Sequence, residues 1–229
     1  MILRRLLDAI MPNLCPVCRK PLVRGEQIMC LECRLNLPVT DYHTDPLNNK
    51  LHEKLMCHAP IQHAGASFFY ERGGRYARII HRAKYDGAPS IARQLGREWA
   101  EVAQPGGMFD GVECLVPIPL SPTKIISRGY NQSYHASLGI SDVAGLPVVE
   151  GLKARMHGSQ TRRSAHERML NAAGIYSVIP SRLDSINHLM LIDDIITTGA
   201  TICACAEAIH KAHPSITISV GALAATRIV

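Results

Sequence analysis

The sequence predicts an α/β fold, in which a mostly parallel, doubly wound sheet carries helices on its faces. Along most of the chain, short apolar runs of strand length alternate with segments of helical spacing, an order typical of parallel sheets. The clearest example is residues 188–213, where an apolar run, a small-residue turn and a helical pattern follow one another directly. A chain of 229 residues, 47% of them hydrophobic, has room for one such domain and a small additional module.

The N-terminal part lacks this alternation. Residues 1–11 are basic and apolar and are not followed by a small-residue cleavage site, which indicates an amphipathic helix rather than a signal peptide. Residues 38–63 are rich in turn formers without sustained periodicity, as expected of a connector. We therefore expect an N-terminal module over residues 1–37, a connector over 38–63 and the α/β domain over 64–229.

Within the α/β domain, apolar spacing and the glycines and prolines that interrupt it define the expected elements. Strands are predicted at residues 64–70, 146–149, 152–156, 174–179, 189–192 and 216–226, and residues 112–120 are predicted to be a strand that passes into a loop. Helices are predicted at residues 75–85, 91–102 and 133–143 and after residue 201. Pro117 and Pro119 cannot donate to a ladder, so pairing should stop there, at the carboxyl edge of the sheet where α/β proteins bind ligands. A loop is expected over 121–132, and the polar segment 157–171 is either a solvated helix or a mobile flap.

The chemistry is concentrated in residues 189–201. The apolar run Leu189–Ile192 is followed by Asp193 and Asp194, and then by the turn Thr197-Thr198-Gly199-Ala200-Thr201. A strand, a tight turn and a helix N-terminus direct backbone N–H groups and the helix dipole at an anion. Carboxylates beside a phosphate are useful if they accept hydrogen bonds from sugar hydroxyls or help to hold a divalent cation. A ribose 5-phosphate unit fits this pattern, and a βα turn whose acids only cap a helix is the alternative.

This pattern strongly resembles the 5-phosphoribosyl-1-pyrophosphate (PRPP) motif of the type I phosphoribosyltransferases. The resemblance implies that Asp193 and Asp194 contact the ribose 2′- and 3′-hydroxyls. It also implies that Thr197, Thr198, Gly199, Ala200 and Thr201 hold the 5′-phosphate, with magnesium bound together with PRPP.

The cysteine pattern favours a structural zinc site. Cys15 and Cys18 form one CxxC pair, and Cys30 and Cys33 form a second one eleven residues further on. Two such pairs can supply four thiolates to a tetrahedral zinc ion, and the short segment needs a metal because it buries too little apolar surface to fold alone. Two disulfides or a redox CxxC are the alternatives.

Charge and hydropathy indicate which kinds of partner and environment the chain is suited to. The net charge of +6 is compatible with an anionic partner, although many proteins without one are as basic. The apolar runs are too short to cross a bilayer, so we expect a protein that is not itself membrane-spanning.

Taken in their order, the motifs resemble the ComF-type competence protein family over nearly the whole chain. They are the paired cysteines, HRAKYDG at 81–87, VPIPL at 116–120, RGYNQ at 128–132, QTRRSAHERMLN at 160–171 and the PRPP-like motif. The resemblance implies a phosphoribosyltransferase fold with an N-terminal zinc finger. It further implies a cytoplasmic role in natural transformation, acting on incoming single-stranded DNA with other competence proteins at the inner membrane as partners.

Polar residues of these motifs are the candidates for binding pyrophosphate or a second substrate. They are His81, Lys84, Lys124, Arg128, Asn131, Gln132, Gln160, Arg168 and Asn171. The sequence departs from the family pattern at Lys124 and Ile126, where arginines are frequent, and at Arg163, where leucine is usual.

Two classes of function fit the sequence. In the first, the chain binds PRPP with Mg²⁺ and uses a basic surface on single-stranded DNA, with contacts from Arg128, Arg162, Arg163 and Arg168. In the second, it is an active phosphoribosyltransferase on an unidentified nucleobase or other small acceptor and does not bind DNA. No catalytic residue and no acceptor can be named from the sequence.

Overall fold

The computed structural model describes residues 13–85, 87–155 and 174–228. The helices of this part are α2 (Leu31–Leu35), α3 (Lys50–Met56), α4 (Ala77–Tyr85), α5 (Pro89–Ala103), α6 (Pro122–Arg128), α7 (Gln132–Ala144) and α9 (Ala200–Ala212). The strands are β1 (Ala64–Tyr70), β2 (Cys114–Pro117), β3 (Leu152–Ala154), β4 (Tyr176–Val178), β5 (His188–Ile196) and β6 (Thr217–Thr226). Short 3-10 turns are η1 (Tyr42–Thr44), η2 (Gln104–Gly106) and η3 (Pro180–Arg182).

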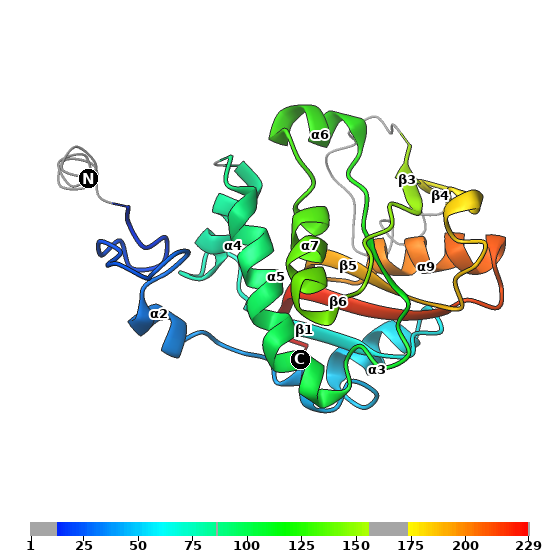
Figure 1. Ribbon diagram of the computed structural model, residues 1–229, viewed down its shortest axis with the longest axis horizontal. Helices are drawn as coiled ribbons and strands as arrows, with labels where there is room; N and C mark the ends of the chain where they lie inside the picture. Colours follow the sequence, from blue (N-terminus) through cyan, green and yellow to red (C-terminus); the bar gives the residue numbers. More distant parts are fainter. Residues whose placement is uncertain (1–12, 86, 156–173, 229) are drawn as a thin grey trace.

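Four of the described strands form one parallel sheet in the order β1-β6-β5-β2. In the register of its two central strands, Leu191 lies opposite Val220. β3 and β4 pair with each other as a separate antiparallel hairpin. Helices cover both faces of the parallel sheet, as Figure 1 shows, so the predicted α/β fold with a mostly parallel, doubly wound sheet is confirmed.

The two faces of the sheet have separate cores. On one face, α4, α5 and α7 pack against Met190 and Ile192 of β5, in a core that also contains Trp99 of α5 and Phe68 of β1. On the other face, α3 and α9 pack against Leu189 and Leu191, the alternate residues of the same strand. A strand buried on both faces must be apolar throughout, which is why β5 begins as a continuous apolar run.

The approach of α5 to α7 depends on glycine. A side-chain Cβ at Gly139 would lie 1.8 Å from the carbonyl oxygen of Arg93, and one at Gly96 would lie 2.3 Å from that of Ala136. Only hydrogen fits at these two positions, so the helix backbones touch directly. This contact places the N-terminus of α7 beside the end of β5.

Apart from the five-residue α2 in the N-terminal module, two described helices lie where the sequence patterns indicated none. The expected loop 121–132 contains α6, which has Pro122 in its first turn and ends at Gly129 with φ of +79°. The expected connector 38–63 contains α3, whose first N–H groups are capped by the side chain of Asn49. Both helices have seven residues, too few for an apolar period to emerge, although their start and stop residues are the usual ones.

β3 and β4 are shorter than predicted, and the strand bounds differ most at two other places. The expected strand at 146–149 is reduced to a single bridge between Val148 and Leu115, because Pro147 cannot donate to a ladder. The motif strand extends beyond its apolar run, since β5 continues to pair with β6 as far as Ile196. Asp193 and Asp194 therefore lie within the strand and not after it.

Some predictions concern other parts of the chain. The amphipathic helix at 1–11 and the polar segment 157–171 lie outside the described residues. Among the residues that are described, no helix has the length and apolar character needed to cross a membrane.

Candidate functional site

The turn after β5 has the form of an anion-binding loop. The chain leaves β5 at Ile196, and α9 begins at Ala200 after Gly199, which adopts φ of +85°. Residues 195–202 and Asp193 surround a hollow of about 30 Å³. That volume holds about one water molecule, so a phosphate group would sit at its mouth rather than inside it.

Backbone donors are available at this loop. In the described part of the chain, the N–H groups of Thr198 and Gly199 have no hydrogen-bond acceptor, and Ala200 N–H makes only a long bond of 3.4 Å to Thr198 Oγ1. The first N–H groups of α9 add to them, together with the positive end of the helix dipole. The loop residues Thr197 to Thr201 are thus brought together in the geometry that binds anions.

Asp193 is held by hydrogen bonds on the strand next to this loop. Its Oδ1 accepts from Ser133 Oγ at 3.2 Å and from the backbone N–H of Asp194 at 2.8 Å. Burial, followed by the negative charge of Asp194, raises the pKa of Asp193 from 3.8 to about 7. Near neutral pH this carboxyl can therefore hold a proton, or its charge can be offset by a cation or stabilised by a hydroxyl that donates a hydrogen bond.

Asp194 forms an ion pair with Lys84, a residue of α4. Its Oδ2 lies 3.0 Å from Lys84 Nζ, and the two side chains are only 13% and 18% exposed. Consecutive strand residues point to opposite faces, so the two acids reach different neighbours. Lys84 comes from α4, while Asp193 is close enough to Cys205 of α9 and Tyr176 of β4 for its charge to raise their pKa values.

A larger pocket, of about 570 Å³, adjoins this ion pair. It is lined by Tyr70, Arg72, Gly73, Gly74, Ala77, Arg78, Ile80, His81, Lys84, Tyr85 and Ile195. His81 and Lys84 were predicted from the sequence, whereas Tyr70, Arg72, Arg78 and Tyr85 were not. The lining contains three lysine or arginine side chains and no carboxylate, a composition that suits a polyphosphate.

Arg128 is joined to this pocket through an aromatic ring. Its guanidinium carbon lies 5.1 Å from the ring centroid of Tyr85, and its Nη1 donates to Gln132 Oε1 at 2.9 Å. The Tyr85 ring in turn lies 4.7 Å from the ring of His81. No ion pair joins Arg128 to a carboxylate of the described residues, so a cation over this tyrosine face keeps its charge available to a ligand.

Two of the other predicted residues of the 121–132 segment, Asn131 and Gln132, have structural contacts. Asn131 caps α7 by accepting from Ser133 N–H, and its amide donates to Ile118 O at 2.9 Å. Gln132 is fully buried, and Lys124 is exposed on α6. Asn131 and Gln132 thereby fix the course of the chain around Arg128. Gln160, Arg162, Arg163, Arg168 and Asn171 lie outside the described residues.

The four paired cysteines converge on one point. The Sγ atoms of Cys15, Cys18, Cys30 and Cys33 all lie within 4.8 Å of one another, and none of these cysteines forms a disulfide. Tetrahedral zinc with Zn–S bonds of about 2.3 Å requires S···S distances of roughly 3.8 Å. The Sγ atoms of Cys18 and Cys30 are 3.6 Å apart, so the group fits such an ion. Burial acts to raise the pKa of Cys15, but hydrogen bonds from the N–H groups of Cys18, Cys30 and Val17 outweigh it and lower the pKa to about 7.

This cysteine module contacts the helices beside the site. Tyr76 OH donates to the carbonyl oxygens of Asn36 and Cys33 at 2.6 and 3.1 Å, and Arg78 Nη1 donates to Val17 O at 3.2 Å. On α5, Glu98 pairs with Arg34 at 2.8 Å. Since Arg78 also lines the 570 Å³ pocket, the module is in contact with the wall of the candidate site.

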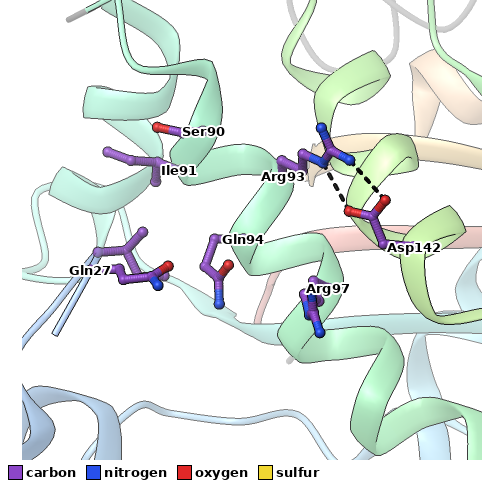
Figure 2. A pocket seen from close by; sticks show the side chains of 8 residues that line it. Gln27, Ser90, Ile91, Arg93, Gln94, Arg97 and Asp142 are labelled. Carbon is purple, nitrogen blue, oxygen red and sulfur yellow. Dashed lines mark hydrogen bonds and ion pairs between the residues drawn. The ribbon is translucent and has the colours of Figure 1, made fainter. Parts of the chain in front are cut away.

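A further hollow, of about 360 Å³, separates the module from α5 and α7 (Figure 2). Gln27 and Ile28 of the module line it together with Gln94 and Arg97 of α5. Its other arginine, Arg93, makes two hydrogen bonds of 2.8 Å to the carboxylate of Asp142. Because that guanidinium is already neutralised, this hollow is a weaker anion site than the pocket on α4.

Comparison with known proteins finds relatives that are named as competence proteins. No family model matches the chain. It is 29% identical over 102 residues to Competence protein F of Haemophilus influenzae, and 34% identical over 87 residues to Competence protein ComFC of Streptococcus pneumoniae. It is 24% identical over 219 residues to Competence protein ComFC of Bacillus subtilis. The chain is similar to the ComF-type competence proteins.

The extent of these matches differs. The first two alignments cover 43% and 38% of this chain and less than half of each relative, 44% and 37% of its length. The third covers 94% of this chain and 79% of the Bacillus subtilis protein, so the likeness to ComF-type proteins extends along nearly the whole sequence. Among solved structures, the glutamine PRPP amidotransferase of B. subtilis complexed with ADP and GMP matches 58% of this chain and 26% of its own, with 19% identity and a TM-score of 0.38. The resemblance expected from the sequence motifs is confirmed by the three competence proteins.

Proposed function

We propose that the chain binds PRPP together with Mg²⁺ at the end of β5. The observation that supports this most directly is the position of Asp193 and Asp194, which lie on the strand that leads into an anion-binding loop. In this proposal the 5′-phosphate lies against the N–H groups of residues 198–201. The two carboxylates accept hydrogen bonds from the ribose 2′- and 3′-hydroxyls, a role taken from the resemblance to phosphoribosyltransferases.

The pyrophosphate of PRPP is assigned to the pocket on α4. Arg72, Arg78 and Lys84 place positive charge there without a carboxylate in the lining, and Lys84 connects the pocket to Asp194. Carboxylate oxygens beside a polyphosphate are the ligands that Mg²⁺ uses in many proteins, and the bound ion would neutralise part of the pyrophosphate charge. Loading of the site requires Asp194 to exchange part of its contact with Lys84 for the ligand.

An active phosphoribosyltransferase is the alternative within the same site. In that reaction an acceptor lone pair forms a bond to the anomeric carbon of PRPP. The bond from that carbon to the pyrophosphate oxygen breaks, and its electron pair leaves with pyrophosphate. The residues of this chain would contribute by positioning PRPP and by stabilising the charge that develops on the leaving group. Nothing in the described residues identifies the acceptor.

We further propose that the protein acts in natural transformation, in the cytoplasm, and binds single-stranded DNA. The names of its relatives support the role in competence. The observation that favours DNA is Arg128, which carries its charge on the face of the half-exposed Tyr85. Together with Arg162, Arg163 and Arg168, it would bind the phosphate backbone weakly, without regard to base sequence and with a steep dependence on salt.

The cysteine module is proposed to hold one zinc ion. Its four thiolates fill every coordination position, so the metal stabilises the module and has no open position for catalysis.

Calorimetric titration of one protein preparation with PRPP–Mg²⁺ and with oligo-dT tests the proposal. We expect PRPP to bind only when Mg²⁺ is present, and oligo-dT to bind at low salt but not at high salt. Binding of PRPP without binding of oligo-dT would favour the enzyme alternative. Absence of PRPP binding would contradict the proposed site.

A further inference from the structure

The carbonyl oxygen of Thr197, the first residue of the anion-binding loop, accepts two side-chain hydrogen bonds. Lys54 Nζ donates to it at 2.5 Å, and Thr226 Oγ1 donates to it at 3.2 Å. Thr226 ends β6, the strand paired with β5, whereas Lys54 is 143 residues away in sequence and belongs to α3. The loop is therefore held from behind by the segment that the sequence indicated as a connector.

The position of Lys54 is fixed by the packing of its helix. Leu51 and Leu55 of α3 are buried in the core between α3, α9 and the sheet. Leu55 also touches the loop itself, since a Cβ placed on Gly199 would lie 2.8 Å from its Cδ2. Because these two leucines anchor the helix, the backbone of Lys54 is held beside the loop.

No carboxylate neutralises Lys54 in the described part of the chain, where its only hydrogen bond is the one to Thr197. Burial lowers the pKa of its ammonium group, which shows that desolvation opposes the charge there. The Lys54 side chain is half-exposed, so its ammonium group carries an unneutralised positive charge beside the loop. The nearest anion-binding geometry is the loop that it supports.

The bond from Lys54 determines the direction of a loop N–H group. The C=O of Thr197 and the N–H of Thr198 belong to one peptide plane, and in a trans peptide the two point in opposite directions. When Lys54 and Thr226 hold the carbonyl on one side, the N–H must point to the other. An ammonium on the carbonyl also polarises the peptide and strengthens its N–H as a donor. This N–H has no acceptor among the described residues.

We propose that Lys54 is a positioning residue for phosphate binding: by holding the Thr197 carbonyl, it directs the Thr198 N–H at the phosphate group of the ligand. This inference rests on the proposed function, because the ligand class is a phosphate monoester such as ribose 5-phosphate. It gives a role at the site to α3, which lies outside the α/β domain predicted from the sequence.

The test is calorimetric titration with ribose 5-phosphate of the wild-type chain and of four variants. Lys54→Met should weaken binding on the order of tenfold, the effect of losing one charged hydrogen bond. Lys54→Arg should bind more tightly than Lys54→Met, because it restores the charge. Thr226→Val should weaken binding by less, since its bond is between neutral groups and is longer. Lys50→Met removes an exposed lysine of the same helix and should have no effect.

A second measurement separates positioning from a loss of folding. In the ligand-free Lys54→Met protein, the amide resonance of Thr198 should shift in an NMR spectrum, while that of Gly145 at the end of α7 stays in place. Thr226→Val provides the same comparison if Lys54→Met does not fold. Equal affinities of wild type and Lys54→Met, or an unchanged Thr198 resonance, would overturn the inference and leave the proposed function standing. Absence of ribose 5-phosphate binding by the wild type would overturn both.

Discussion

Replacing Gly199 by alanine should damage both the stability and the ligand affinity of the loop. Gly199 has φ of +85°, and a Cβ there would lie 2.8 Å from Leu55 Cδ2. The positive φ costs an alanine about 1–2 kcal/mol. Displacing the buried Leu55 adds a packing cost of about 1 kcal/mol, the low end for crowding a core. We therefore expect a loss of about 2–3 kcal/mol in the free energy of unfolding. At about 2–4 °C per kcal/mol for a chain of this size, the midpoint should fall by about 4–12 °C.

Gly145→Ala is the matched control. Gly145 has φ of +71° at the end of α7, but a Cβ there would meet no atom within 4 Å. It should therefore cost only the backbone strain of about 1–2 kcal/mol and leave ligand binding unchanged. Urea denaturation of the two variants and the wild type, with titration of ribose 5-phosphate into each, measures both quantities. If Gly199→Ala were no more destabilising than Gly145→Ala and bound the ligand equally well, the assignment of the loop as a tightly packed phosphate cradle would be refuted.

Three further predictions concern the paired cysteines, the contact of α5 with α7, and the protonation of Asp193. Elemental analysis of protein purified without added metal should find one zinc per chain, and Cys30→Ser should reduce this content; a metal-free wild type with oxidised cysteines would contradict the zinc site. Gly139→Ala should destabilise the protein by about 2 kcal/mol or more in urea denaturation, because its Cβ would lie 1.8 Å from Arg93 O; a neutral result would contradict the close contact of α5 and α7. Asp193 has a pKa raised from 3.8 to about 7, so between these values the folded chain binds a proton that the unfolded chain does not. The stability that this proton provides is present below pH 3.8 and is lost as pH rises through 7. The stability of Asp193→Asn relative to wild type should therefore increase between pH 5 and pH 8; denaturation curves at the two pH values with equal differences would refute the raised pKa.

The sequence was most informative where the chemistry is local. The strand, the two acids, the threonines and Gly199 are contiguous, and each residue type has its own physical reason to be there, so the loop could be predicted without knowledge of the rest of the fold. The convergence of the four paired cysteines could be predicted for the same reason, since CxxC spacing brings two thiolates together within a single turn. The apolar runs of β1, β5 and β6 fixed the class of the fold because strands buried on both faces leave a clear hydrophobic signal.

What the sequence did not reveal depends on contacts between distant segments. Arg72 and Tyr70 reach the site only because β1 ends beside α4, although a cation and two glycines directly after a strand were a signal that could have indicated them. Lys54 is the clearest case, since its role follows from the packing of α3 on the loop. Short helices were missed because seven residues carry little periodicity, even though Asn49 and Gly129 are ordinary cap residues.

The most direct test of the central claim is the affinity of PRPP–Mg²⁺ for wild type and for the double variant Asp193→Asn and Asp194→Asn, measured by calorimetric titration. We expect the wild type to bind with one site per chain. Each lost charged hydrogen bond should cost about 1–3 kcal/mol, so the double variant should bind at least about tenfold more weakly. Thermal unfolding of the double variant verifies that it is folded. If the folded double variant bound PRPP–Mg²⁺ as tightly as the wild type, the assignment of the two acids and their loop as the ribose 5-phosphate site would be contradicted.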